Sequence, residues 1–444
     1  MSDNRRVIHA EPTKELFIYM LVRDIPLIRA IVDLVDNSVD GATRLQSNQN
    51  YEGLWIKILA NKQFFKIEDN CGGITVKEAE EYAFKFGRAN DAEATPKSIG
   101  RFGIGMKRAF FKIGKKFTVE STTSNSNFVV SENIEEWKRK DEWTFEFQGQ
   151  VQEGGEYEAS EIGTRILIEE LHESVAEDLG LENFLSQLTQ ELTIAYSLKI
   201  KKGLRISINE VEIHPNPLNF RSSDEIKVAK FEKEYKYFGS REIDTPVQVR
   251  LYAGVSERSL DEGGWYVFCN ERMVLEADQT EITGWGTKTG FPKYHPDFAF
   301  FRGYAFFESD DAAYLPWTTT KTGIDYDSPI YKSIKQELYQ LTAPVITFLR
   351  RMAEEKSRVE RGEISESLLE QAYSQTSLHS VFDANTSTTF QMPEQSAIPP
   401  NQKRGTIQYN KPIEEINLVK ELLDVSSNKE VGEKTFDYYL LNEG

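Results

Sequence analysis

The chain has 444 residues, of which 39% are hydrophobic, enough for two or three domains with apolar cores. Its formal net charge of −18 excludes a protein that grips nucleic acid along most of its surface, and leaves only local basic stretches at 106–116 and 197–205 for such contacts. The chain has no run of about 18 apolar residues, no signal-peptide core at its start and only two cysteines. We therefore expect a cytoplasmic protein with no membrane span.

Helix and strand patterns alternate over residues 1–178. A helix is predicted over 24–46, because Leu27, Ile31 and Leu34 recur at helical spacing. Alternating apolar residues predict strands at 53–60, 63–69, 117–123, 127–133, 142–150 and 163–171. Strands grouped with helices that cover one face indicate an α+β sandwich.

A second, smaller α/β domain is predicted over 179–372. Its expected elements are a helix at 181–198, strands at 205–213, 247–255, 264–275 and 304–309, and a closing long helix at 328–362. Because proline disrupts a helix interior, we expect an interruption near Pro344.

The C-terminal part contains little hydrophobic sequence. Residues 373–411 are rich in Ser, Thr, Pro and Gln and are predicted to be a flexible linker without a packed core. Residues 412–444 hold one predicted amphipathic helix and an aromatic tail, and this segment is too short to fold alone. We expect this segment to dock onto this chain or onto a partner protein.

The predicted helix at 24–46 carries the first group of chemically useful side chains. Asp33, Asn37 and Asp40 are spaced i, i+4 and i+7, so they share one face of the helix. A carboxylate one turn from a carboxamide can hold a water and a hydrated Mg²⁺ side by side, because Mg²⁺ prefers oxygen ligands. The alternative is the solvated polar face of an amphipathic helix.

Two strand ends carry further candidates. Asp69 ends a strand just before Gly72 and Gly73, where a carboxylate can accept a hydrogen bond from an exocyclic amine. The alternative is a β-turn that uses Asp and Asn for local hydrogen bonds. Thr164, which follows Gly163, begins another strand and can aim its hydroxyl into a pocket, or it can simply start that strand.

A glycine-rich stretch at 98–114 precedes a predicted helix. Gly100, Gly103 and Gly105 permit close backbone approach, and a helix start offers free N–H donors, so together they can cradle phosphate. The spacing fits neither a P-loop nor the dinucleotide-binding fingerprint. On its own it is weak evidence for any one ligand.

The four motifs, in this order over residues 33–164, resemble the Bergerat-fold domain of the GHKL superfamily. That superfamily includes gyrase B, the MutL mismatch-repair proteins, the MORC ATPases, the large heat-shock chaperones and the sensor histidine kinases. The similarity is closest to the MORC/MutL-like branch. The resemblance implies a mixed, mainly antiparallel sheet with helices on one face, followed by a transducer-like domain, a long helix, a linker and a short tail.

The resemblance also implies roles for individual residues in binding ATP and Mg²⁺. Asn37 would ligate Mg²⁺, Asp69 and Thr164 would contact the adenine amino group, and Lys107 would lie near the phosphates. Residues 84–98 would form a mobile lid. The full set of implied nucleotide-binding residues is Asn37, Asp40, Asp69, Gly73, Ile74, Gly100, Gly103, Ile104, Gly105, Met106, Lys107 and Thr164.

Two positions depart from the pattern of the superfamily. The general-base position usually holds Glu and here holds Asp33, one methylene shorter, with Asp36 as a fallback candidate offset around the helix. Cys71 replaces the first glycine of the Asp-x-Gly-x-Gly motif, a change for which Gly72 can compensate.

The resemblance extends into the second domain. Residues 264–275 look like the transducer strand that is followed by an Asn-x-Arg turn. Lys321, within the loop 315–325, stands where related proteins carry a lysine to the γ-phosphate, and it would stabilise charge developing there. The alternative is an ordinary surface lysine.

The resemblance therefore implies Mg-dependent ATP binding and slow hydrolysis, coupled to lid closure and to a switch in a homodimer or in a partner contact. DNA handling and phage defence are settings known for the superfamily. The alternative is a scaffold that binds ATP without hydrolysing it. A histidine kinase is disfavoured, because only His9 precedes the nucleotide-binding region and no helical hairpin fits there.

Overall fold

The computed structural model describes residues 12–46, 48–87, 96–99, 103–149, 151–238, 241–287, 291–393 and 407–443. The chain divides into two compact units, one made of Met1–Glu354 and Leu368–Glu394 and the other of Glu355–Ser367 and Gln395–Gly444. The described residues of the predicted site belong to the first unit. His9 lies outside the described residues.

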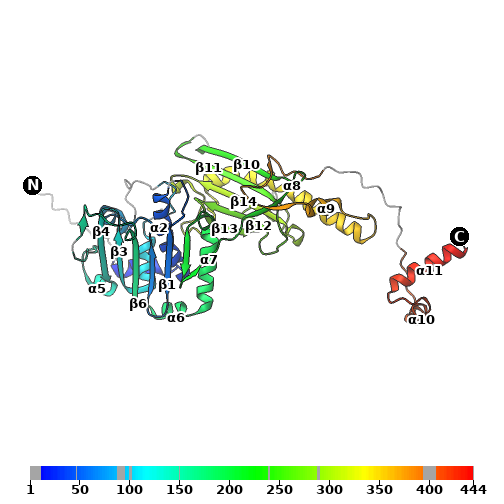
Figure 1. The fold of residues 1–444 in the computed structure, drawn as a ribbon, viewed down its shortest axis with the longest axis horizontal. Helices are drawn as coiled ribbons and strands as arrows, with labels where there is room; N and C mark the ends of the chain where they lie inside the picture. The colour runs from blue at the N-terminus through cyan, green and yellow to red at the C-terminus, as the bar shows by residue number, and fades with distance from the viewer. Residues whose placement is uncertain are drawn as a thin grey trace, which may run out of the picture. The chain divides into compact units, whose positions relative to one another are not determined.

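The first sheet has the strand order β5-β4-β3-β6-β2-β1-β7-β8. Its pairs are antiparallel except for β1 and β7, which run parallel. Figure 1 labels β4, β3, β6 and β1 in this order across the sheet, with β2 between β6 and β1. The strands are β1 (Trp55–Ala60), β2 (Phe65–Asp69), β3 (Gly114–Thr122), β4 (Ser126–Asn133), β5 (Gln152–Glu153), β6 (Gly163–Leu171), β7 (Arg205–Ile208) and β8 (Val211–Glu212).

Register aligns the buried side chains of these strands into rows, because successive residues of a strand point to opposite faces. One row consists of apolar residues: Ile58, Ile67, Ile166 and Val119 are neighbours across β1, β2, β6 and β3. The next row, two residues along each strand, contains Ile56 followed by the polar residues Asp69, Thr164 and Ser121. Polar side chains therefore meet at one end of an otherwise apolar face.

Helices pack together on this face of the sheet. Helix α2 (Leu27–Leu45) contacts α4 (Gly105–Ile113), α7 (Glu182–Lys201) and β2, while α4 also contacts β3 and β6. The apolar residues of α2 are almost all buried, as its helical spacing predicts. The remaining elements of this region are α1 (Lys14–Val22), α3 (Val76–Glu78), the π-helical turn η1 (Ala79–Ala83), α5 (Ile134–Arg139) and α6 (Glu173–Leu179).

Two predictions for this region are wrong. Of the strand predicted at 142–150, the described residues 142–149 form no regular strand: Phe147 makes an isolated bridge to Val130, and Phe145 stacks on the ring of Trp137 instead of extending a ladder. The first sheet also continues past the boundary predicted at residue 178, because β7 pairs with β1.

The second sheet has the strand order β13-β12-β14-β11-β10-β16, with β9 joining β11 to β15. Strands β12 and β14 are buried on both faces, which explains the apolar sequence of β12 and of residues 303–307 in β14. The predicted fold class, a mainly antiparallel α/β sandwich followed by a second α/β domain, is confirmed. The elements are β9 (Asn219–Ser222), β10 (Val228–Phe238), β11 (Arg241–Val255), β12 (Gly264–Cys269), β13 (Arg272–Asp278), η2 (Pro296–Phe298), β14 (Phe301–Glu308) and η3 (Ala312–Tyr314).

The long closing helix is continuous, which corrects the interruption expected at Pro344. Helix α8 (Pro329–Glu360) runs through this proline. Proline in a helix interior removes one hydrogen bond and costs about 3 kcal/mol. Here the flanking side chains are buried against the core, and their packing offsets that cost: Leu341, Thr342, Val345, Ile346, Phe348 and Leu349.

Part of the predicted linker is also packed. Strand β15 (Ser377–Ser380) pairs with β9 and β16 (Thr386–Ser387) pairs with β10, after the short helix α9 (Leu368–Ser374). Val381 and Phe390 are buried, the latter against the ring of Phe348. These two apolar residues, isolated in a polar stretch, give no periodic signal from which the sequence could predict a strand.

The C-terminal segment contains two helices, α10 (Ile413–Leu423) and α11 (Asn428–Glu443). The predicted aromatic tail is therefore helical too. In the described part of the chain, every helix is too short or too polar to cross a bilayer.

Substituting Phe390 by Ala is expected to lower the free energy of unfolding by about 3–5 kcal/mol, since it leaves a cavity beside Phe348. Urea denaturation measures this loss. The control is Leu378→Ala on β15, whose side chain is 44% exposed and whose loss should stay below about 1 kcal/mol. Equal, small losses at both positions would show that 377–391 is a free linker.

Candidate functional site

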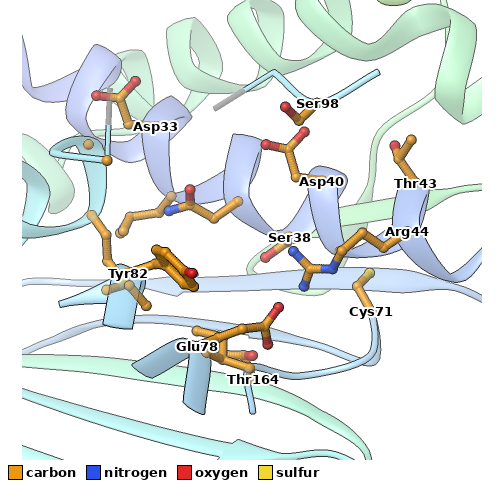
Figure 2. Close-up of a pocket in the computed structure, with 18 of the residues that line it drawn as sticks. Asp33, Ser38, Asp40, Thr43, Arg44, Cys71, Glu78, Tyr82, Ser98 and Thr164 are labelled. Atoms are coloured by element: carbon orange, nitrogen blue, oxygen red, sulfur yellow. The ribbon is translucent and has the colours of Figure 1, made fainter. Parts of the chain in front are cut away.

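One large cavity, of about 1300 Å³, opens between α2, the turn after β2, the start of α4 and the second domain. Figure 2 shows side chains that line it. The sequence-predicted residues that it brings together are Asp33, Asn37, Asp40, Asp69, Gly73, Ile74, Gly103, Ile104, Gly105, Met106, Lys107, Thr164 and Lys321. Gly100 and residues 88–95 of the predicted lid lie outside the described residues.

Helix α2 forms the long side of this cavity. Figure 2 places Asp33 toward one end and Arg44 toward the other, with Ser38 and Asp40 between them. Asn37 is exposed within a run of buried residues at 30–42, so its carboxamide opens into the cavity. The polar edge predicted for this helix therefore faces the cavity.

Asp69 lies on the opposite wall and is linked to α2 by a hydrogen bond. The hydroxyl of Ser38 donates to Asp69 Oδ2 over 2.6 Å, while the amides of Cys71 and Thr164 donate to Oδ1 over 2.8 and 3.4 Å. Burial raises the pKa of the Asp69 carboxyl, although these donors oppose the shift. These hydrogen bonds fix the Asp69 carboxylate in position as an acceptor on this wall of the cavity.

Ser121 completes the polar row of the sheet. Its hydroxyl lies 3.2 Å from Thr164 Oγ1 and accepts from the Ile74 amide over 2.7 Å. These contacts orient the Thr164 hydroxyl and hold the turn after β2 against β3. Ser121 belongs to the site only through strand register.

The turn after β2 retains its shape despite the cysteine in the motif. Gly72 and Gly73 have φ of +98° and +71°, and a Cβ at Gly73 would lie 2.2 Å from the Thr122 carbonyl. Cys71 is outside the positive-φ region and is buried against Gly41, whose missing Cβ leaves room for the Cys71 carbonyl. Gly73 therefore occupies the second glycine position of the motif, and Gly72 supplies the first glycine one position later.

The start of α4 closes another side of the cavity. Lys107 is 1% exposed, and its ammonium donates to the carbonyls of Ala83, over 2.8 Å, and Gly103. Burial lowers the pKa of Lys107 to about 7. Asp40 Oδ1 accepts from the Ile99 amide over 2.6 Å, which ties the start of the glycine-rich stretch to α2.

The two acidic candidates for a general base have different environments. Asp33 lines the cavity, where Arg108 makes an ion pair with it. Asp36 is 1% exposed, does not line the cavity and bonds to Arg272 and Lys321. The fallback role considered for Asp36 is therefore wrong, because its carboxylate is buried away from the cavity and both of its oxygens are bonded to other side chains.

The second domain contributes Asp310, Thr319 and Lys321 to the cavity wall. The Asn-x-Arg turn joins β12 to β13 and lies against the first domain. The Asn270 carboxamide donates to the Ser98 carbonyl over 3.2 Å, and Glu271 pairs with Lys199 over 3.1 Å. The cavity is thus a joint product of the two sheets.

Sequence reasoning missed several residues of the site. Ser38 stands next to Asn37 in the first motif, and this proximity was an available signal. Ser121, Glu78, Tyr82 and Arg44 line or brace the cavity without a motif of their own. Their places follow from register and helix packing.

In the ranges that the structure describes, no cluster of three or more His, Cys, Asp or Glu side chains could hold a metal ion. The candidate metal ligand that opens on the cavity near Asp33 is the carboxamide oxygen of Asn37. A hard amide oxygen fits Mg²⁺ when phosphate oxygens and waters supply the remaining ligands.

Replacing Lys107 by Met is expected to flatten the rise in unfolding free energy above neutral pH. The unfolded chain keeps this amine protonated up to its ordinary pKa of 10.5, whereas the folded chain releases the proton near pH 7. The unfolded state then binds more protons, so stability rises by roughly 1.4 kcal/mol per pH unit over this window. Urea unfolding between about pH 7.5 and pH 9 measures the slope.

The control for that measurement is Lys112→Met, on the same helix and only partly buried. A slope that changes equally in the two variants, or in neither, would contradict the assignment to Lys107.

Comparison with known protein families finds a match for the first domain. Residues 25–164 match the family described as histidine kinase-, DNA gyrase B- and HSP90-like ATPases. No curated protein matches the chain. The match covers all four motifs and supports a GHKL-type, ATP-binding domain in this part of the chain.

Proposed function

We propose that the chain binds ATP with Mg²⁺ in this cavity and hydrolyses it slowly. The observation that carries the proposal is that the exposed carboxamide of Asn37 and the buried carboxylate of Asp69 line one cavity. ATP needs both: Asn37 would serve the phosphates and Asp69 the adenine ring. The adenine amino group would donate to Asp69, and Thr164 would complete that contact. Asn37 would provide the protein ligand for Mg²⁺, which would neutralise phosphate charge when bound.

Hydrolysis would use Asp33 as general base. The carboxylate would take a proton from a water molecule while the water oxygen attacks the γ-phosphorus. The bond from the γ-phosphorus to the β–γ bridging oxygen would break. Lys107 and Lys321, from opposite walls, would face the phosphates. Positive charge there stabilises charge that develops on the transferred group.

The proposed nucleotide cycle would move the segment between η1 and α4. Residues 84–98 lead from the cavity wall into the glycine-rich stretch, and Asn270 of the second domain already contacts Ser98. Movement of this segment over ATP would therefore change its contact with the second domain. By analogy with the superfamily, that movement would drive a homodimer or partner switch, with 412–444 as the partner-binding segment and DNA handling or phage defence as settings.

A second candidate is a module that binds ATP without turnover. The Asp33–Arg108 ion pair favours it, because the guanidinium competes with the attacking water for a carboxylate that is already one methylene short. Phosphate release distinguishes the two candidates.

Asp69→Asn is expected to weaken ATP binding at least about tenfold, because it replaces a charged acceptor of the adenine amino group. Calorimetric titration measures the affinity, and thermal denaturation should show an intact fold. The control is Glu68→Gln, the same change one residue earlier, on the opposite face of β2. Equal ATP affinities for wild type and Asp69→Asn would show that the adenine ring does not bind at Asp69.

Asp33→Asn is expected to lower the steady rate of phosphate release about 100-fold or more while ATP affinity changes little. The matched control is Asp24→Asn, an exposed carboxylate just before the same helix. Wild-type protein that binds ATP and releases no phosphate above background would establish the non-hydrolysing module. Release that persists in Asp33→Asn would exclude Asp33 as the base.

A further inference from the structure

A buried charge cluster joins α2 to the second domain behind the cavity wall. Asp36 Oδ1 accepts from Arg272 Nε over 2.8 Å and from the Tyr196 hydroxyl over 2.6 Å. Asp36 Oδ2 accepts from Lys321 Nζ over 2.8 Å. The four side chains come from α2, α7, β13 and the loop after η3.

The cluster pairs two cations with one carboxylate in a dry environment. Asp36 and Arg272 have side chains 1% and 2% exposed, whereas the Lys321 side chain is 10% exposed and lines the cavity. Burial alone would raise the pKa of Asp36, but Arg272 and Lys321 hold it down to about 2. The carboxylate therefore stays charged at neutral pH. It balances one of the two cations, and Lys321 is the cation that lies at the cavity wall.

The two carboxylate oxygens of Asp36 accept hydrogen bonds from different partners. Oδ1 serves Arg272 and Tyr196, so Oδ2 remains for Lys321. Arg272 Nη1 also donates to the Lys321 carbonyl over 2.7 Å, which anchors the backbone of the loop. Lys321 has φ of +56°, an uncommon conformation for a residue with a Cβ, and the surrounding contacts hold it there.

We propose that Asp36 is the positioning residue for Lys321: it fixes the ammonium at the cavity wall, so that its remaining N–H donors meet the γ-phosphate of ATP. An ammonium has three donors, and Asp36 uses one of them. The proposal rests on the proposed ATP site. It deepens that site by making ATP recognition depend on a contact between the two sheets.

Two measurements test it, using the full-length chain. The first needs no nucleotide: a double-mutant cycle of Asp36→Asn and Lys321→Met on the free energy of unfolding. The expected result is that the two losses are not additive, because each substitution breaks the same contact. Additive losses would show that Asp36 does not hold Lys321.

The second measurement is the ratio of ADP to ATP dissociation constants, which reports contact with the γ-phosphate. Wild type is expected to favour ATP about tenfold, and both Asp36→Asn and Lys321→Met should lose that preference. Asp36→Asn should have no added effect on the ratio in the Lys321→Met background. A purely structural role would weaken ATP and ADP binding equally and leave the ratio unchanged.

Asp36→Asn leaves Arg272 buried without a charge partner, and such a change can unfold a protein. In that case Asp36→Asn/Arg272→Met, which removes both charges, replaces it in both measurements with the same expectations. The matched control is Asp327→Asn, an exposed carboxylate paired with Lys332 beyond the same loop, which should preserve the ratio. A retained preference for ATP in the Asp36 variants would overturn the inference and leave the proposed ATP site standing. If wild type binds no ATP, the proposed function fails. The unfolding cycle then decides by itself whether Asp36 holds Lys321.

Discussion

The register of the first sheet is the constraint on which the site depends. Because β2, β6 and β3 are aligned as they are, Asp69, Thr164 and Ser121 become neighbours in one row. A shift of one residue in any of these strands would turn its polar side chain to the other face. The Ser38–Asp69 hydrogen bond then fixes the distance between this row and α2, so helix and sheet together set the width of the cavity.

The turn between β12 and β13 plays the corresponding part for the second domain. Three consecutive residues contact three elements: Asn270 binds Ser98, Glu271 pairs with Lys199, and Arg272 pairs with Asp36. Asn270 and Glu271 have φ of +47° and +65°, which such a two-residue turn requires. One tight turn therefore ties the cavity wall, α7 and α2 to the second sheet.

Charge in this protein is arranged locally. The chain carries a net charge of −18, yet the cavity wall contains Lys107, Arg108 and Lys321. Each of these basic side chains has a hydrogen-bonding partner in the described structure, and Asp33 and Asp69 line the same cavity, so none of the three faces the cavity without a partner. Lys107 and Lys199 belong to the two basic stretches of the sequence but are each 1% exposed, which removes them from any outward-facing basic patch.

The sequence by itself determined the local features. The shared edge of Asp33, Asn37 and Asp40 follows from helical periodicity, and the span of β6 follows from alternation over 163–171. Periodicity describes neighbours along the chain and says nothing of distant partners. Only the tertiary structure decided that Asp36 is buried, because Arg272 and Lys321 come from 236 and 285 residues away. It likewise decided that α8 continues through Pro344 and that 377–391 joins a sheet, since packing against the core outweighs local propensity there.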